Sequence, residues 1–137
     1  MGKRILLVGA TGLVGQGVLR VLLGSDQVEA VSVLVRHPLA SPDPRVQLLL
    51  APEFSAGALA AIDLRDHDAC LYCAGPMPLG LSEAAYREAT VATLERVLAA
   101  YAGANPGGFV AYISGMGADA GSALMPLRVK GEAEQVL

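Results

Sequence analysis

The feature that most constrains this chain is a glycine-rich turn near its N-terminus, within the segment ILLVGATGLVG at residues 5–15. An apolar run leads into Gly9, Gly12 and Gly15, which follow one another at intervals of three residues. The apolar run predicts a buried strand, and the stretch after the glycines predicts a helix. The chain is therefore limited to folds in which a bare, sharply turning backbone joins a strand to a helix.

Strands and helices alternate along the rest of the chain. Aromatic residues make up only 4% of a chain that is 53% apolar, so the core must be aliphatic, as in a parallel sheet buried on both faces. The alternation predicts such a sheet, with right-handed crossovers. We expect strands at residues 4–8, 30–36, 45–51, 68–74 and 109–114, helices at 13–23, 82–102 and from about 127, and a short helix or turn at 55–65.

Two of the expected helices have identifiable packing positions. In the helix at 13–23, four apolar residues share one face: Val14, Val18, Val21 and Leu22. The long helix begins at Ser82, a good N-cap, with Glu83 in the first turn where the helix dipole favours negative charge. Its candidate packing positions are Ala85, Ala89, Ala92, Leu94 and Leu98.

Charge and composition argue against several classes of function. The net charge is −3 and there is no basic stripe, so nucleic acid is not an expected partner. No targeting segment is visible, and no stretch approaches the roughly 20 apolar residues of a membrane span. Cys70 and Cys73 lie in an apolar run without a second pair, and we interpret them as small core residues rather than a metal or redox site. Without a disulfide framework, we expect the cytoplasm as location.

A strand, a glycine turn and a helix in this order are typical of a phosphate site. Glycines let the backbone turn and let a ligand approach closely, and the helix N-terminus offers free N–H groups and a partial positive charge. We therefore expect a pyrophosphate to lie against residues 9–15. The alternative is a tight strand–helix turn that serves packing only and binds no ligand.

Five segments together resemble the short-chain dehydrogenase/reductase superfamily, and most closely its extended and atypical members, which include epimerase-like and NmrA-like proteins. They are GATGLVG (9–15), LVR (34–36), CAG (73–75), YISGMGAD (112–119) and RVKGEAE (128–134). The resemblance implies an α/β, Rossmann-like, doubly wound parallel sheet of about five strands with helices on both faces. Residues 1–137 would form a single NAD(P)-binding domain that lacks the C-terminal part of the family fold.

The nucleotide preference depends on the residues that follow the second strand. An NAD site usually has an acidic residue there for the ribose 2′-hydroxyl, whereas this chain has Arg36 and then His37. The guanidinium can pair with a 2′-phosphate, which favours NADP over NAD, unless Arg36 is simply a solvated charge. By the resemblance, Ala74 and Gly75 line the cofactor ribose. The complete set of expected cofactor-binding residues is Gly9, Thr11, Gly12, Leu13, Val14, Gly15, Arg36, Ala74 and Gly75.

The catalytic residues implied by the resemblance are incomplete. Reductases of this superfamily use a serine after the fifth strand and a Tyr-x-x-x-Lys pair on the next helix. Ser114 and Lys130 stand at the serine and lysine positions, but Pro126 occupies the tyrosine position. Proline has no proton to transfer and suits the start of a helix. Tyr112, two residues before Ser114, is either a substitute or a packing residue.

Three functions remain open at this point. The chain is an NADP-dependent oxidoreductase or epimerase-like isomerase acting on a small molecule that the sequence does not identify, or it is a non-catalytic NADP-binding sensor or scaffold of the NmrA-like kind. The third reading is a fold that binds nothing. The fifth strand is expected to form a sheet edge, which invites pairing or coverage, so the chain is either a fragment or part of a homo-oligomer.

Overall fold

The computed structural model describes residues 2–41 and 43–137, and within them the sheet has five parallel strands in the order β3-β2-β1-β4-β5. The strands are β1 (Lys3–Val8), β2 (Val28–Val35), β3 (Val46–Leu50), β4 (Ala69–Tyr72) and β5 (Phe109–Tyr112). The helices are α1 (Leu13–Leu23), η1 (Pro52–Phe54), α2 (Ala56–Ala60), α3 (Glu83–Arg87), η2 (Glu88–Ala92), α4 (Thr93–Ala104) and α5 (Met125–Glu134).

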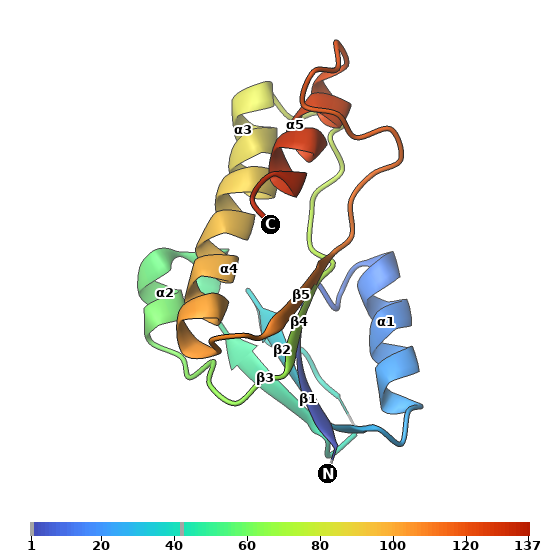
Figure 1. Ribbon diagram of the computed structural model, residues 1–137, viewed down its shortest axis with the longest axis vertical. Helices are drawn as coiled ribbons and strands as arrows, with labels where there is room; N and C mark the ends of the chain where they lie inside the picture. Colours follow the sequence, from blue (N-terminus) through green and yellow to red (C-terminus); the bar gives the residue numbers. More distant parts are fainter. Residues whose placement is uncertain (1, 42) are drawn as a thin grey trace.

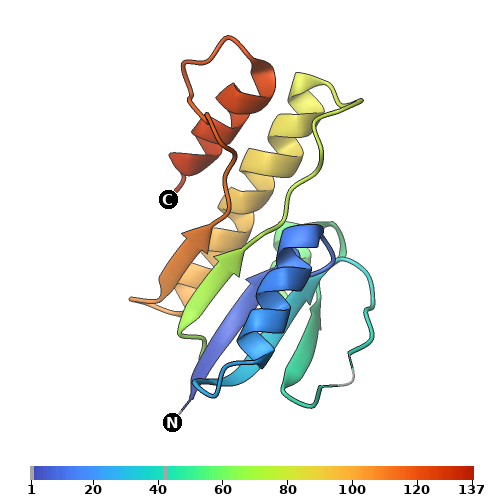
Figure 2. The same ribbon diagram turned by 90° about the vertical axis from the view of Figure 1, so that its right-hand side faces the viewer.

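The sheet lies between two helical layers, with α1 on one face and α2 and α4 on the other (Figures 1 and 2). Successive strand residues point to opposite faces, so each strand feeds two cores. Leu7 and Val33 pack on the α1 side, whereas Leu6 and Leu34 pack on the side of α2 and α4. The structure thus confirms the expected doubly wound parallel α/β sheet, and β5 lies at its edge within the described residues.

Helix α1 has the predicted bounds but not the predicted buried face. The side chains of Val14 and Val21 are 48% and 74% exposed, although the periodicity placed both with Val18 and Leu22. The residues that pack against the sheet are Val18, Leu19, Leu22 and Leu23. Apolar residues occur almost all around this helix, so contact with β1 and β2 selects the buried face rather than the sequence pattern.

The long helix predicted from Ser82 runs through α3, η2 and α4 and ends at Ala104. The Ser82 hydroxyl accepts a hydrogen bond from the Ala85 amide at 3.1 Å, which confirms the predicted N-cap. Its middle segment, η2, is π-helical, a local widening that is frequent at functional sites. The upper part of this helix and α5 stand beyond the tips of β4 and β5 (Figure 2).

The two cysteines do not form a joint site. Cys70 is buried in the core beneath α4, whereas Cys73 packs on the α1 side and is half-buried. No group of histidine, cysteine and acidic residues in the described part of the chain could hold a metal ion. Among the helices of residues 2–41 and 43–137, none has the length and apolar character needed to cross a membrane.

Candidate functional site

The loops after β1 and β4 meet at the point where the order of the strands along the sheet reverses. From β1 the chain passes outward to β2 and β3, and then crosses to β4 and β5 on the other side. The Cys73 amide donates to the Val8 carbonyl at 2.8 Å, which holds these two loops together. In open parallel sheets, ligands bind in the crevice outside the carboxyl ends of the strands at such a switch point.

A cleft of about 650 Å³ occupies this position. Its floor is the glycine turn and the end of β4, and one wall is the helix face that carries Ala85, Glu88 and Ala89. Six expected cofactor-binding residues line it: Gly9, Thr11, Gly12, Arg36, Ala74 and Gly75. The other three do not, because Gly15 is buried and the side chains of Leu13 and Val14 point outward, 90% and 48% exposed.

The three glycines of the turn are required for different reasons. Gly9 has a φ of 88°, and a Cβ there would lie 2.4 Å from the Ala74 nitrogen. A Cβ on Gly15 would lie 1.8 Å from the Gly9 carbonyl oxygen. Gly12 differs, since its φ is −75° and the nearest atom to an added Cβ is 3.8 Å away. The packing of the protein itself therefore explains Gly9 and Gly15 but leaves open space at Gly12.

The first turn of α1 faces the same space. Gly12 is the N-cap and carries no side chain to accept a hydrogen bond from the amides that follow it. The first N–H groups of a helix have no intrahelical acceptor, and the helix dipole places partial positive charge there. The first turn of α1 contains no acidic residue that would neutralise this charge. The backbone amides of Leu13 and Val14 can therefore bind an anion in the cleft, although their side chains point outward.

The wall at the end of β3 is a turn that the sequence did not predict. Glu53 and Phe54 have φ values of 56° and 45°, a left-handed backbone that non-glycine residues rarely adopt. The Arg96 side chain stabilises this turn, because its Nε donates to the Phe54 carbonyl at 3.1 Å. The Arg36 guanidinium carbon lies 6.0 Å from the centre of the Phe54 ring. Arg36 is therefore presented at this end of the cleft, beside Phe54.

Sequence reasoning missed the helical wall of the cleft. Ala85 and Ala89 were expected to pack in the core, yet both line the cleft, and the Ala85 side chain is exposed. Thr93 and Arg96 continue the same row along the helix. The spacing of four, four and three residues places all four on one helical face, and this regularity was the available signal.

The two expected catalytic residues lie near the carboxyl end of β5. The Lys130 ammonium donates to the Tyr112 hydroxyl at 3.2 Å, and burial lowers the pKa of Lys130. Burial also raises the pKa of Tyr112 to about 12. The Ser114 hydroxyl is buried and finds no hydrogen-bond partner in the described part of the chain. Pro126 lies in the first turn of α5, so the tyrosine of the expected motif is replaced by a helix-starting residue.

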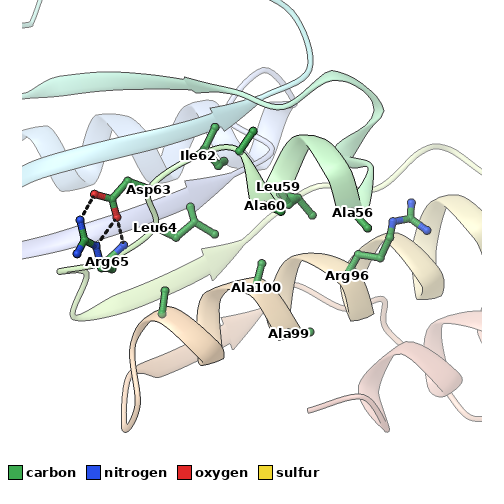
Figure 3. Close-up of a pocket in the computed structure, with 12 residues that line it drawn as sticks. Ala56, Leu59, Ala60, Ile62, Asp63, Leu64, Arg65, Arg96, Ala99 and Ala100 are labelled. Carbon is green, nitrogen blue, oxygen red and sulfur yellow. Dashed lines mark hydrogen bonds and ion pairs between the residues drawn. The ribbon is translucent and has the colours of Figure 1, made fainter.

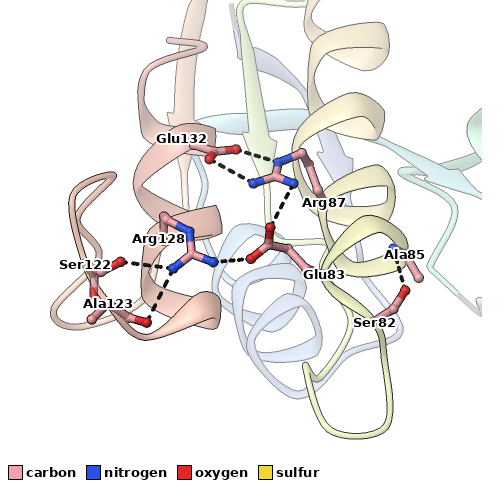
Figure 4. Close-up of polar contacts among 8 residues, drawn as sticks. All are labelled: Ser82, Glu83, Ala85, Arg87, Ser122, Ala123, Arg128 and Glu132. Carbon is pink, nitrogen blue, oxygen red and sulfur yellow. Dashed lines mark hydrogen bonds and ion pairs between the residues drawn. The ribbon is translucent and has the colours of Figure 1, made fainter.

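Helix α5, which carries Lys130, is tied to α3 by four charged side chains (Figure 4). The Arg87 Nε and Nη2 atoms donate to both oxygens of Glu132, at 2.8 and 3.0 Å. Glu83 pairs with Arg87 at 3.4 Å and also with Arg128. The Arg87 hydrogen bonds lower the pKa of Glu132, and the same contact raises the pKa of Arg87. We call Glu83, Arg87, Arg128 and Glu132 the α3–α5 cluster.

A second hollow, of about 760 Å³, lies between α2 and α4 (Figure 3). Alanines make up much of its lining, among them Ala60, Ala99 and Ala100. Its rim carries the Asp63–Arg65 pair, whose charges neutralise each other at 2.9 Å. The hollow borders the loop that enters β4, away from the strand ends where the polar residues converge. The cleft is therefore the candidate functional site.

Comparison with known proteins agrees with this architecture. No protein-family model matches the chain, and no curated protein matches its sequence significantly. Among solved structures, it resembles a short-chain dehydrogenase from Burkholderia cenocepacia in complex with NADP, with a TM-score of 0.80 and 20% identity over 98% of this chain and 63% of that chain. It also resembles uronate dehydrogenase from Agrobacterium tumefaciens complexed with NAD, with a TM-score of 0.78 and 18% identity.

The match to uronate dehydrogenase covers 99% of this chain and 55% of that chain. Glucuronic acid dehydrogenase from Chromohalobacter salexigens gives the same coverage, with a TM-score of 0.78 and 15% identity. The chain thus spans little more than half the length of these structures, although each match covers nearly all of this chain. The chain has the Rossmann-type fold of the short-chain dehydrogenase/reductase and epimerase-like proteins.

Proposed function

We propose that the chain binds a nicotinamide dinucleotide in the cleft, with its pyrophosphate against Gly12 and the first turn of α1. The observation that carries the proposal is the open space at Gly12, where an added Cβ would meet no atom closer than 3.8 Å. The protein's own packing does not demand a glycine there, whereas a phosphate group seated on the backbone does. The structural relatives solved with NAD and with NADP support the same class of ligand.

We further propose NADP as the preferred form. Arg36 lies at the end of β2, lines the cleft beside Phe54 and offers a planar set of donors to a 2′-phosphate. His37 lies next to it on the cleft. Glu53 lines the same end of the cleft, on the turn that follows β3. Its negative charge would repel the 2′-phosphate, so its carboxylate must point away from that group.

Bound there, the cofactor would supply hydride transfer to or from a small carbonyl or alcohol substrate. Lys130 and Ser114 would serve the nicotinamide end, Lys130 by binding the ribose and Ser114 by orienting a substrate oxygen. An oxidoreductase or epimerase-like activity is therefore the leading function. Pro126 at the tyrosine position favours the second candidate, a non-catalytic NADP-binding sensor or scaffold.

Calorimetric titration with NADPH and NADH tests the proposal. We expect NADPH to bind more tightly, and Arg36→Ala to remove about 1.5–3 kcal/mol of binding free energy for NADPH, roughly 10- to 150-fold, with little effect on NADH. Gly12→Ala should fold normally and lose affinity for both nucleotides, because its methyl group occupies the phosphate position. Gly17→Ala is the matched control, since Gly17 lies on the same helix and a Cβ there meets no atom within 4 Å.

Two results would contradict this assignment. If the wild-type chain bound neither nucleotide, the glycine turn would serve packing alone. If Gly12→Ala bound as tightly as wild type, the pyrophosphate would not lie where we place it. If NADPH does bind, its consumption in a screen of small carbonyl compounds would distinguish the enzyme from the sensor.

A further inference from the structure

Lys130 does not itself line the cleft, but its ammonium lies next to Gly75, which does, on the side of β1 away from Arg36. A Cβ added to Gly75, which lines the cleft, would lie 3.5 Å from Lys130 Nζ. Gly75 follows β4, whereas Arg36 follows β2. The dinucleotide proposed above would extend from Arg36 to Gly75, with its adenosine half beside Arg36 and its second ribose beside Gly75.

Tyr112 is the hydrogen-bond partner that fixes this ammonium. The two side chains come from different elements, β5 and α5, and meet at 3.2 Å between Nζ and the phenolic oxygen. Nζ also lies 5.4 Å from the centre of the Tyr112 ring. The phenol oxygen is the acceptor in this contact.

The surroundings keep both groups in place. Tyr112 packs against Tyr72, with 5.8 Å between ring centres, so its ring is held from the side of β4. On the other side, the α3–α5 cluster holds α5 against α3 (Figure 4). Glu134, and Tyr72 and Tyr86 when they are ionised, are further titratable groups whose negative charge acts on Tyr112. A flexible lysine side chain is thus confined by its phenolic partner and by the helix that carries it.

We propose that Tyr112 is a positioning residue that holds the Lys130 ammonium at the Gly75 end of the cleft, as the phenol partner that Pro126 does not provide on α5. Tyr112 acts through Lys130, and the ligand group that Lys130 receives is the diol of the ribose next to the nicotinamide. This step rests on the proposed dinucleotide function. The pairing itself does not, because both residues belong to the free protein, and the two can be tested separately.

The pairing can be measured without any ligand, because the chain contains only two lysines, Lys3 and Lys130. Selective ¹³C,¹⁵N-lysine labelling gives two side-chain NMR signals, which Lys3→Arg assigns. Removing the Tyr112 hydroxyl takes away an acceptor that stabilises the charged amine, so Tyr112→Phe should make Lys130 titrate at lower pH. Lys3 should not change. Tyr72→Phe is the control, since it removes a neighbouring hydroxyl that has no partner in the described residues.

The consequence for binding is tested with the nucleotide that wild type prefers and with its adenosine half, 2′,5′-ADP for NADPH or ADP for NADH. Tyr112→Phe should weaken the whole dinucleotide severalfold and leave the half-molecule unchanged. In Lys130→Met, the further change Tyr112→Phe should have no additional effect, because Tyr112 acts through the missing amine.

Each outcome decides one of the two ideas. An unchanged Lys130 titration in Tyr112→Phe, or the same change in Tyr72→Phe, overturns the pairing. Additive losses in the double variant, or equal losses for the half-molecule, overturn the positioning role. If wild type binds neither nucleotide, the dinucleotide function fails, and the NMR titration alone still decides whether Tyr112 sets the state of Lys130.

Discussion

Replacing Gly15 with alanine is expected to destabilise the fold, whereas the same replacement at Gly17, two residues further along α1, is expected to stabilise it. A Cβ on Gly15 would lie 1.8 Å from the Gly9 oxygen and 2.6 Å from the Gly9 carbonyl carbon. These are backbone atoms of the glycine turn, so relief requires α1 or the turn to move. At Gly17, by contrast, an added Cβ meets nothing within 4 Å.

The magnitudes follow from two opposing effects. Alanine in a helix interior is favoured over glycine by about 0.5–1 kcal/mol, which is the full effect expected at Gly17. Overpacking costs about 1–3 kcal/mol or more, so Gly15→Ala should lose about 1–2 kcal/mol net. For a domain of this size, about 1 kcal/mol corresponds to roughly 4 °C in Tm. Gly15→Ala should therefore melt about 4–8 °C below wild type, and Gly17→Ala about 2–4 °C above it.

Circular dichroism during heating and urea titration measures both variants. The urea slope should stay at its wild-type value, so that the midpoints report stability alone. The reasoning is refuted if Gly15→Ala melts at or above the wild-type temperature, because α1 would then not approach Gly9 as closely as described. It is also refuted if the two variants change in the same direction by similar amounts.

Two further changes probe polar contacts that support the fold, the first between α3 and α5 and the second at the loop that enters β4. Arg87 lowers the pKa of Glu132 in the folded protein, so the stability contributed by this carboxylate should be complete above its usual pKa of 4.5 and lost as the pH falls through the lowered, folded-state pKa. Glu132→Gln should reduce this loss of stability in acid, which is measured as the urea midpoint at a series of pH values. Asn105 is buried, its Oδ1 accepting from the His67 amide at 2.9 Å and its Nδ2 donating to the Leu64 carbonyl at 2.7 Å. Asn105→Ala should cost about 2–4 kcal/mol in urea unfolding, because it leaves buried backbone groups without partners, and a loss below about 0.5 kcal/mol would contradict that account.

The order and type of the main elements could be predicted because each has a strong local signal. The apolar runs of β1, β2 and β4 are short, as expected of strands rather than helices. The glycine turn, Gly75 and Ser82 mark where elements end or begin. The glycine turn also predicted the floor of the cleft, because one segment contains both the strand end and the helix start. These predictions needed no information from distant parts of the chain.

The residues that sequence reasoning missed depend on contacts between distant segments. The positive φ values at Glu53 and Phe54 have no sequence signal, and the stabilising donor is Arg96, 42 residues further along. The pairing of Tyr112 with Lys130 likewise exists only once α5 has docked beside β5. Local periodicity describes which side of an element is apolar, but it does not say which neighbour that side will meet.

The two ends of the cleft are therefore held by different physical means. The end beside Arg36 rests on a strained turn, on the Phe54 ring and on a hydrogen bond from Arg96, whereas the Lys130 end depends on the ionised carboxylates of the α3–α5 cluster. Acid that protonates Glu132 removes an acceptor from Arg87 and loosens α5, but it leaves the glycine turn unchanged because that turn is built from backbone contacts. If the chain binds a dinucleotide as proposed, acid should therefore weaken its hold on the nicotinamide half before its hold on the adenosine half.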